Sequence, residues 1–304
     1  MDRKDLVIVG SGPAGLSAAV YAQRAKLDQV VIEKEMFSGG QIVTTDRVDN
    51  YLGLYGESGY DLAVKFREHA DKLGVPFMED TVCKITDKGE YKEVYLESGS
   101  VIETKAVLFA TGANHRKLNV KGEKELTGAG VSYCATCDGA FFKGKKVAVV
   151  GGGDVALGDA LYLSNICEKV YLIHRREELR ASKELQQKVM EKDNIDFMPF
   201  YEVKEIIGEG KVEKITVEQN QTNETSSLDI SGVFIAVGME PQSELLKGLT
   251  ELDKSGYIKA GEDCRTSVPG IYALGDIRTK NLRQVITAVA DGALAVASLE
   301  QDLT

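Results

Sequence analysis

The 304-residue chain is long enough for two domains with separate cores, and its 43% hydrophobic and 28% charged residues are typical of a folded, water-soluble protein. The formal net charge of −10 argues against a nucleic-acid partner, because phosphate binding needs a basic surface. No apolar run is long enough to span a membrane, and the N-terminus leads directly into a predicted strand. We therefore expect a cytoplasmic protein without a signal peptide and without a membrane partner.

The first part of the chain predicts a nucleotide-binding unit. A strand is expected at Leu6–Val9, a helix up to about Ala25, and a second strand at Val30–Glu33, because short apolar runs alternate here with a helical pattern. The glycine-rich turn between the first strand and the helix reads Gly10-Ser11-Gly12-Pro13-Ala14-Gly15. Strand, glycine turn, helix and strand in this order are typical of a dinucleotide-binding fold.

The residues of this unit suit a particular kind of nucleotide. Gly10 permits the tight turn, Gly12 lets backbone N–H groups approach a pyrophosphate, and Gly15 permits close packing of helix on strand. Glu33 ends the second strand, where a carboxylate can bind a ribose diol and repels a 2′-phosphate. We expect this unit to bind FAD or NAD and not NADP; the alternative is a glycine turn without a ligand.

The cysteine pair Cys134/Cys137 has two residues between its thiols, a spacing that lets them close a disulfide. Half of a zinc site is the alternative, but such a site needs four ligands, and the three histidines are scattered. We therefore predict a redox pair and no metal. Asp138 follows the second thiol directly and can move protons as the disulfide opens, or else cap a turn. The isolated cysteines, which we expect to be buried, are Cys83, Cys167 and Cys264.

A second segment repeats the plan of the first unit. It has a predicted strand at Lys146–Val150, a helix up to about Ser164 and a strand at Val170–His174. The glycine turn between the first strand and the helix reads Gly151-Gly152-Gly153-Asp154-Val155-Ala156, with Ala156 as the small third residue. The chain therefore carries two dinucleotide-binding units.

Basic residues stand at the end of this unit's second strand, where the first unit has an acid. Guanidinium groups match the geometry of a phosphate, so the cluster predicts a site for the 2′-phosphate of NADPH. The alternative is a solvated basic start of a helix, with Glu177 and Glu178 as ion-pair partners. The cluster consists of His174, Arg175, Arg176 and Arg180.

Further strands end in glycine at Ala106–Ala110, before Thr111-Gly112, at Val233–Val237, before Gly238, and at Ile271–Leu274, before Gly275-Asp276. The first two are natural points for the chain to cross between domains. The helix expected at Val285–Leu299 has no glycine turn of its own, so it should complete the first unit. We predict an α/β fold of two Rossmann-like, three-layer ββα units, the second inserted in the first. The predicted boundaries are residues 1–113 and 242–304 for the FAD unit and 114–241 for the NADPH unit with the cysteine pair.

Together these residues resemble the low-molecular-weight, bacterial-type thioredoxin reductases over nearly the whole chain. The most specific segment is Cys134-Ala135-Thr136-Cys137-Asp138-Gly139. The other matching residues are the two glycine turns, Gly39-Gly40-Gln41, Asn50, Ala110-Thr111-Gly112, His174-Arg175-Arg176 with Arg180, Gly275-Asp276 and Arg283-Gln284-Val285.

The resemblance implies a homodimer that passes electrons from NADPH through FAD and the cysteine pair to the disulfide of a thioredoxin. It implies that Cys137 faces the flavin, that Cys134 attacks thioredoxin, and that Asp276 binds the ribityl chain of FAD. Arg283, Gln284 and Val285 would cover the isoalloxazine. The further cofactor-binding residues implied are Lys34, Gly39, Gly40, Gln41, Asn50, Val82, Ala110, Thr111, Gly112 and Gly238.

One departure from this family lies in the helix after the second glycine turn. The family usually has two glutamates where this chain has Gly158-Asp159, and a hydroxyl residue where it has Val155. Gly158 costs about 1 kcal/mol of helix stability relative to alanine, and NADPH affinity or hydride geometry is expected to change. Two alternatives stay open: the same disulfide reductase fed by ferredoxin, and a flavin-containing redox sensor.

The position of the cysteine pair predicts a domain rotation during the catalytic cycle. Other flavin disulfide reductases carry their pair in the FAD unit, where this chain has Gly39-Gly40-Gln41 without a cysteine. Nicotinamide and disulfide must each contact the flavin ring, and we do not expect one rigid arrangement to offer both. The expected hinges are residues 112–115 and 238–242.

Overall fold

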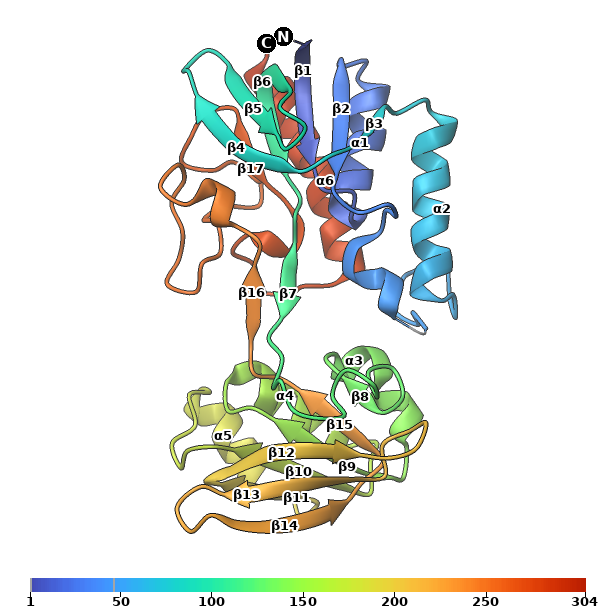
Figure 1. Ribbon diagram of the computed structural model, residues 1–304, viewed down its shortest axis with the longest axis vertical. Helices are drawn as coiled ribbons and strands as arrows, with labels where there is room; N and C mark the ends of the chain where they lie inside the picture. The colour runs from blue at the N-terminus through green and yellow to red at the C-terminus, as the bar shows by residue number, and fades with distance from the viewer. Residues whose placement is uncertain (1, 46) are drawn as a thin grey trace. The chain divides into compact units, whose positions relative to one another are not determined.

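The computed structural model describes residues 2–45 and 47–304, and the chain divides into two compact units. One unit comprises Met1–Asn114 with Glu240–Thr304, and the other comprises His115–Met239. The chain passes between the units at β7 (Ala113–His115) and β16 (Met239–Pro241), which pair as a two-stranded sheet (Figure 1).

The first unit is built on a seven-stranded sheet in the order β3-β2-β1-β6-β5-β4, with β17 also paired to β6. Strands β3, β2, β1, β6 and β17 run parallel, whereas β5 and β4 continue the sheet antiparallel. The start of β6 pairs with β5 and its end pairs with β17, so this one strand joins both parts. The strands are β1 (Asp2–Val9), β2 (Gln29–Glu33), β3 (Phe77–Glu79), β4 (Val82–Asp87), β5 (Lys92–Leu96), β6 (Val101–Phe109) and β17 (Ile271–Ala273).

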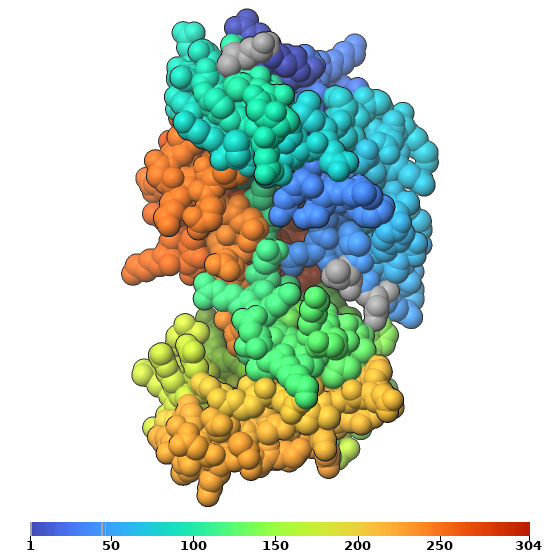
Figure 2. All heavy atoms as spheres, in the orientation of Figure 1, coloured from blue at the N-terminus to red at the C-terminus, as the bar shows by residue number. Residues whose placement is uncertain are grey.

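Side chains of β1 alternate between two cores on the faces of this sheet, as the period of a strand requires. Leu6 and Ile8 face a core shared with helices α1 (Pro13–Arg24) and α6 (Val285–Asp302). A Cβ on Gly292 of α6 would lie 2.4 Å from a backbone oxygen of α1, so these two helices cross in close contact. The C-terminal segment therefore completes the first unit. Figure 2 shows its orange-to-red atoms against the blue and cyan atoms of the N-terminal segment.

The second unit has three layers. Its five-stranded sheet, in the order β11-β10-β9-β15-β8, is parallel throughout. Val147 and Val149 of β9 face a core with the helices, whereas Ala148 and Val150 face a core with the antiparallel sheet β12-β13-β14. The elements are β8 (Val131–Ser132), β9 (Lys146–Val150), α4 (Asp154–Ser164), β10 (Lys169–His174), α5 (Lys183–Met190), β11 (Ile195–Pro199), β12 (Tyr201–Ile207), β13 (Lys214–Gln219), β14 (Glu224–Asp229) and β15 (Gly232–Ile235).

The predicted α/β fold with two Rossmann-like sheets is confirmed, with small differences at element ends. β15 ends at Ile235 and not at the predicted Val237, because its partner strand β9 ends at Val150, which pairs with Ile235. No helix within residues 2–45 and 47–304 is long and apolar enough to cross a membrane. The remaining elements are η1 (Gly40–Thr44), α2 (Gly59–Lys72), α3 (Ala135–Asp138), η2 (Gly139–Phe142), η3 (Glu244–Leu246) and η4 (Gly275–Ile277).

Candidate functional site

The first glycine turn, between β1 and α1, is shaped by close backbone contacts. Gly10 has φ of +97°, and a Cβ there would lie 2.8 Å from the carbonyl oxygen of Ala110. A Cβ on Gly15 would lie 1.9 Å from the carbonyl oxygen of Gly10, so no larger residue fits without moving the backbone. A Cβ on Gly12, in contrast, would meet nothing within 4 Å. The space at Gly12 is open to a ligand.

Helix α1 begins at this open position. Gly12 is its N-cap and makes no side-chain cap, Pro13 follows without an N–H, and the first turn holds no acid. The N–H groups of an uncapped first turn and the helix dipole both favour an anion. The turn therefore fits the pyrophosphate of a dinucleotide.

Glu33, at the end of β2, points its carboxylate at the turn. Oε2 accepts hydrogen bonds from the backbone N–H and the hydroxyl of Ser11, both at 2.7 Å. Oε1 accepts the N–H of Glu35 at 3.1 Å. Oε2 uses both of its lone-pair directions for Ser11, whereas Oε1 retains one, so Glu33 can brace the turn and still accept a ribose hydroxyl through Oε1. Ser11 itself is fully buried.

Two glycines that follow β2 lie against the first turn. Gly39 has φ of +120°, and its N–H donates to the carbonyl oxygen of Ser11 at 2.9 Å. Gly40 has φ of +59°, and a Cβ there would lie 3.6 Å from Cα of Gly12. This segment therefore forms a second wall of the open space at Gly12.

Asp276, in η4, has a buried carboxylate oxygen, Oδ1, without a hydrogen-bond partner in the structure. Burial raises the pKa of Asp276, against the opposing effect of Lys280 and Arg283. The neighbouring Gly275 lies on α1, since a Cβ there would be 3.0 Å from Cβ of Ala14. A buried acceptor without a donor beside a nucleotide turn fits the hydroxyl of a bound ligand. This oxygen is therefore suited to accept a hydrogen bond from a hydroxyl of the ribityl chain of FAD.

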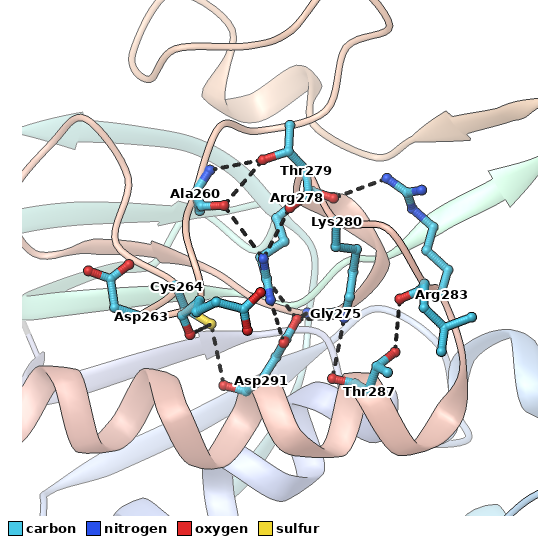
Figure 3. Close-up of polar contacts among 12 residues, drawn as sticks. Ala260, Asp263, Cys264, Gly275, Arg278, Thr279, Lys280, Arg283, Thr287 and Asp291 are labelled. Atoms are coloured by element: carbon cyan, nitrogen blue, oxygen red, sulfur yellow. Dashed lines mark hydrogen bonds and ion pairs between the residues drawn. The ribbon is translucent and has the colours of Figure 1, made fainter. Parts of the chain in front are cut away.

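The segment that carries Asp276 is tied to α6 by a buried carboxylate, Asp291 (Figure 3). Its Oδ2 accepts from the Gly275 N–H at 2.8 Å and from Lys280 Nζ at 2.9 Å. Arg278 donates to both oxygens, at 2.9 and 2.7 Å, and both side chains are almost fully buried. Burial would raise the pKa of Asp291, but the hydrogen bonds from Arg278 and Lys280 outweigh it and lower the pKa.

The start of α6 is held by two of the residues predicted to cover the isoalloxazine. Gln284 is the N-cap and forms a capping box with Thr287, and its Oε1 accepts from Asn50 Nδ2 at 2.9 Å. The guanidinium of Arg283 lies 4.0 Å from the ring centroid of Tyr257 and donates to two backbone oxygens of the Asp276 segment. Asn50 and Gln284, far apart in the sequence, are thus brought together.

Other predicted FAD residues are less directly placed at the turn. Lys34 is exposed and forms an ion pair with Glu35. Val82 is buried as the first residue of β4. Thr111 donates its hydroxyl to the carbonyl oxygen of Gln242 at 2.9 Å, which ties the two crossing segments of the first unit together.

The second unit holds the disulfide Cys134–Cys137, and helix α3 begins at Ala135, directly after the first cysteine. Both cysteines are partly exposed, and Thr136 between them is exposed. Of the isolated cysteines, Cys167 and Cys264 are buried as predicted. Cys83 is exposed, so the prediction was wrong there: β4 shifts register between Val82 and Lys84, and the extra residue points outward.

Asp138 ends α3 and is bound by a side chain that the sequence did not single out. Ser132, at the end of β8, donates its hydroxyl to Oδ2 of Asp138 at 2.5 Å. The same hydroxyl accepts the backbone N–H of Cys134 at 3.1 Å. The carboxyl group predicted to move protons is therefore anchored to the backbone of the first cysteine.

The second glycine turn is also shaped by contacts that exclude a Cβ. At Gly151 a Cβ would lie 2.3 Å from the carbonyl oxygen of Ala236, and at Gly152 it would lie 2.5 Å from the ring of His174. At Gly153, the N-cap of α4, nothing lies within 4 Å. This unit therefore repeats the open space of the first one and fits a second pyrophosphate.

The three arginines are exposed beside this turn. The backbone N–H of Arg180 donates to the carbonyl oxygen of Gly152 at 2.7 Å, so the segment after β10 is fixed to the turn. Within residues 2–45 and 47–304, the side chains of Arg175, Arg176 and Arg180 form no ion pair. The alternative of a helix start paired with Glu177 and Glu178 is therefore wrong. Helix α5 begins only at Lys183.

His174 belongs to the core of this unit. Its side chain is buried against Gly152, Nε2 has no hydrogen-bond partner in the structure, and burial lowers its pKa. A neutral imidazole under the turn shapes the site without adding charge.

Helix α4 carries the residues in which the chain departs from the family pattern. Val155 is 70% exposed in the first turn, where a bound nucleotide could cover it. A Cβ on Gly158 would meet no atom within 4 Å, so packing does not require a glycine at this position. Asp159 is partly buried, and burial raises its pKa to about 7. The helix thus holds a carboxyl group that can be neutral near neutral pH.

Comparison with known proteins identifies relatives over the whole chain. Residues 4–292 match the family model described as "Pyridine nucleotide-disulphide oxidoreductase". A thioredoxin reductase of Bacillus subtilis (strain 168) is 44% identical over 297 residues, which are 97% of this chain and 93% of that protein. One of Peptoclostridium acidaminophilum is 43% identical, covering 98% of this chain and 96% of that protein. The crystal structure of thioredoxin reductase from Streptococcus pyogenes MGAS5005 matches with a TM-score of 0.93 at 44% identity, covering 99% of this chain and 98% of that one.

Proposed function

Since the chain belongs to the pyridine nucleotide-disulphide oxidoreductase family, and within it to the thioredoxin reductases, we propose that it passes electrons from NADPH through FAD and Cys134/Cys137 to the disulfide of a thioredoxin. The observation that carries the proposal is the Cys134–Cys137 disulfide beside Asp138, in the same unit as a nucleotide turn flanked by three exposed arginines.

The first unit is the FAD site in this proposal. The pyrophosphate lies at Gly12 and the first turn of α1, Glu33 accepts a ribose hydroxyl, and Oδ1 of Asp276 accepts a hydroxyl of the ribityl chain. Support comes from the open space at Gly12 and the unpartnered buried oxygen of Asp276. Bound FAD would accept a hydride and pass the electrons as a pair to sulfur. The protein's part is to hold and orient it.

The second unit is the NADPH site. Its pyrophosphate lies at Gly153 and the start of α4, and the 2′-phosphate lies against Arg175, Arg176 and Arg180. These guanidinium groups are exposed and have no acidic partner among residues 2–45 and 47–304, which supports this assignment because their charge is left for a ligand. The same observation argues against ferredoxin as the donor, since that donor has no need of a 2′-phosphate site.

The cysteine pair carries the exchange with thioredoxin. The thiolate of Cys134 attacks one sulfur of the substrate disulfide, and the thiolate of Cys137 then attacks Cys134 to release the reduced product. Asp138 takes a proton from one sulfur and returns it to another. The partial exposure of both cysteines supports access by a protein substrate.

Removing each thiol tests this assignment. Cys134→Ser and Cys137→Ser should each abolish NADPH-dependent thioredoxin reduction, while NADPH still bleaches the flavin absorbance. Cys83→Ser is the matched control, because this cysteine is exposed but lies in the first unit. Thioredoxin reduction at the wild-type rate in both variants would reject the proposal.

We further propose that the enzyme works in the cytoplasm and that it forms a homodimer, the latter as the family resemblance implies. Light scattering coupled to size-exclusion chromatography measures the mass against the 33.0 kDa of one chain.

A further inference from the structure

The hydroxyl of Ser132 lies at the centre of the redox segment. It is 2.5 Å from Oδ2 of Asp138, 3.1 Å from the backbone nitrogen of Cys134 and 3.3 Å from the carbonyl oxygen of Cys134. The side chain is 5% exposed, so little water competes for these contacts. One short side chain therefore connects the proposed proton carrier to the first cysteine.

A serine hydroxyl has one hydrogen to donate and two lone pairs. The contact of 2.5 Å to a carboxylate has the length of a charge-assisted hydrogen bond, whereas 3.3 Å to a carbonyl is long for O–H···O. The hydrogen therefore goes to Asp138, and the Cys134 N–H occupies a lone pair of the same oxygen. A donor of this kind stabilises the charged carboxylate more than the neutral acid.

We infer that Ser132 is a positioning residue that sets where the Asp138 carboxylate lies and how readily it gives up its proton during thiol–disulfide exchange. This inference rests on the proposed role of Asp138. Among residues 2–45 and 47–304, the Ser132 hydroxyl hydrogen-bonds to the Asp138 carboxylate and to the Cys134 backbone, and to neither cysteine sulfur. It acts by fixing Oδ2 of Asp138 to the backbone at Cys134.

The step it serves balances without a further reactant. The dithiol loses two electrons and two protons and closes the Cys134–Cys137 bond, while the substrate disulfide breaks and gains both. In the first half the Cys134 sulfur forms a mixed disulfide, and one substrate sulfur leaves as a thiolate. In the second half the Cys137 thiolate attacks Cys134, and the other substrate sulfur leaves. Asp138 carries the proton of the Cys137 thiol to one leaving sulfur, and the other leaving sulfur takes from solvent the proton that Cys134 gave up when it became a thiolate.

Other titratable groups near α3 need separate controls. Helix α4 packs against α3 and carries Asp154, Asp159 and Tyr162, of which Asp159 has a pKa raised by burial to about 7. Tyr133, between Ser132 and Cys134, donates to Glu123, and burial with this bond raises its pKa. Strand β15 beside β8, and η2 after α3, hold no titratable side chain.

The test is the pH profile of exchange between the pre-reduced holoenzyme and a small aromatic disulfide, which reads the cysteine pair without requiring thioredoxin. Ser132→Ala should move the inflection that depends on Asp138 upward by about one pH unit, because the charged form has lost a donor. Ser132→Thr keeps the hydroxyl and should restore the wild-type inflection. In Asp138→Asn, adding Ser132→Ala should cause no further shift.

The inference is overturned by an unmoved inflection in Ser132→Ala, by the same shift in the Asp138→Asn background, or by loss of the Ser132-dependent shift in Asp159→Asn. A uniform fall in rate with a lower melting temperature also rejects it, since that indicates a purely structural serine. Failure of the wild type to reduce thioredoxin, with the shift intact, rejects the proposed substrate and leaves the inference standing.

Discussion

The two nucleotide turns of this protein share a backbone and differ in what braces them. In both, two glycine positions exclude a Cβ and one opens to solvent at a helix start. The first turn is braced by a carboxylate, Glu33, which binds Ser11 of the turn itself. The second is braced by the ring of His174, packed against Gly152, with the arginines outside it.

This difference separates two tasks that one motif combines. The glycines fix the path of the backbone and the place of the pyrophosphate, which any dinucleotide needs. The residue at the end of the second strand decides which ribose is accepted, because it sets the charge beside the 2′ position. The first turn has a further support, the Asp291 cluster, in which Asp291 of α6 binds Arg278, Lys280 and the backbone N–H of Gly275.

The largest effect is expected from breaking that support. Asp291→Asn leaves Arg278 and Lys280 buried without a counter-charge, so the free energy of unfolding should fall by about 3–5 kcal/mol, and FAD should dissociate more readily. Chemical unfolding and FAD retention on gel filtration measure the two effects.

Glu300→Gln is the matched control for Asp291→Asn on the same helix, because Glu300 is exposed near the end of α6. It should cost about 1 kcal/mol or less. Equal losses in the two variants would show that the Asp291 cluster is not special to the first turn.

The next largest effect comes from comparing two glycines of the first turn, one that fixes the path of the backbone and one that faces the ligand. Gly15→Ala places a Cβ 1.9 Å from a backbone oxygen, so the protein should lose about 2–3 kcal/mol of stability even without FAD. Gly12→Ala meets no protein atom and should leave the apoprotein stable while weakening FAD binding. Thermal unfolding with and without FAD compares them, and a stable Gly15→Ala apoprotein would contradict the packing argument.

Changing the charge beside the second turn should alter nucleotide choice without altering stability. Arg175→Ala combined with Arg180→Ala should lower the preference for NADPH over NADH by about a hundredfold or more, since each guanidinium–phosphate contact contributes about 1.5–3 kcal/mol. The ratio of kcat/KM for the two nucleotides measures it. Arg24→Ala, an exposed arginine at the end of α1, should change nothing. A wild type that uses both nucleotides equally would remove the 2′-phosphate argument.

The sequence predicted those features of the two units that are specified by neighbouring residues in the chain. The glycine turns, the strands around them and the Cys134/Cys137 pair are each specified by neighbouring residues, and the structure contains all of them. The alternative reading of the arginine cluster, the basic start of a helix, failed for a local reason as well. Ser182 caps α5 by accepting the N–H of Leu185, so the helix starts after the cluster and leaves Arg180 in an irregular loop.

The supporting residues could not be predicted, because their partners are distant in the sequence. Ser11 binds a carboxylate at the end of the next strand, and Asp291 binds a segment that reaches the site only through packing of α6 on α1. Ser132 offered a weak signal, a hydroxyl close before the cysteine pair. Only the fold shows that α3 turns Asp138 back onto it.

The smallest effect is expected in α4. This helix carries a partly buried acid, Asp159, whereas α1 carries no acidic side chain. Burial raises the pKa of Asp159 to about 7, above the 3.8 of an ordinary aspartate. The folded state then binds a proton that the unfolded state has lost, so the stabilisation is complete below about pH 4 and is lost as the pH rises towards 7. Asp159→Asn should remove this pH dependence and, at alkaline pH, raise the stability of the second unit by about 1–2 kcal/mol.

Urea unfolding on both sides of neutral pH measures the difference, with Asp154→Asn on the exposed start of the same helix as the control. If wild type and Asp159→Asn show the same dependence on pH, the carboxyl group is solvated and its substitution for the family's glutamate has no electrostatic consequence.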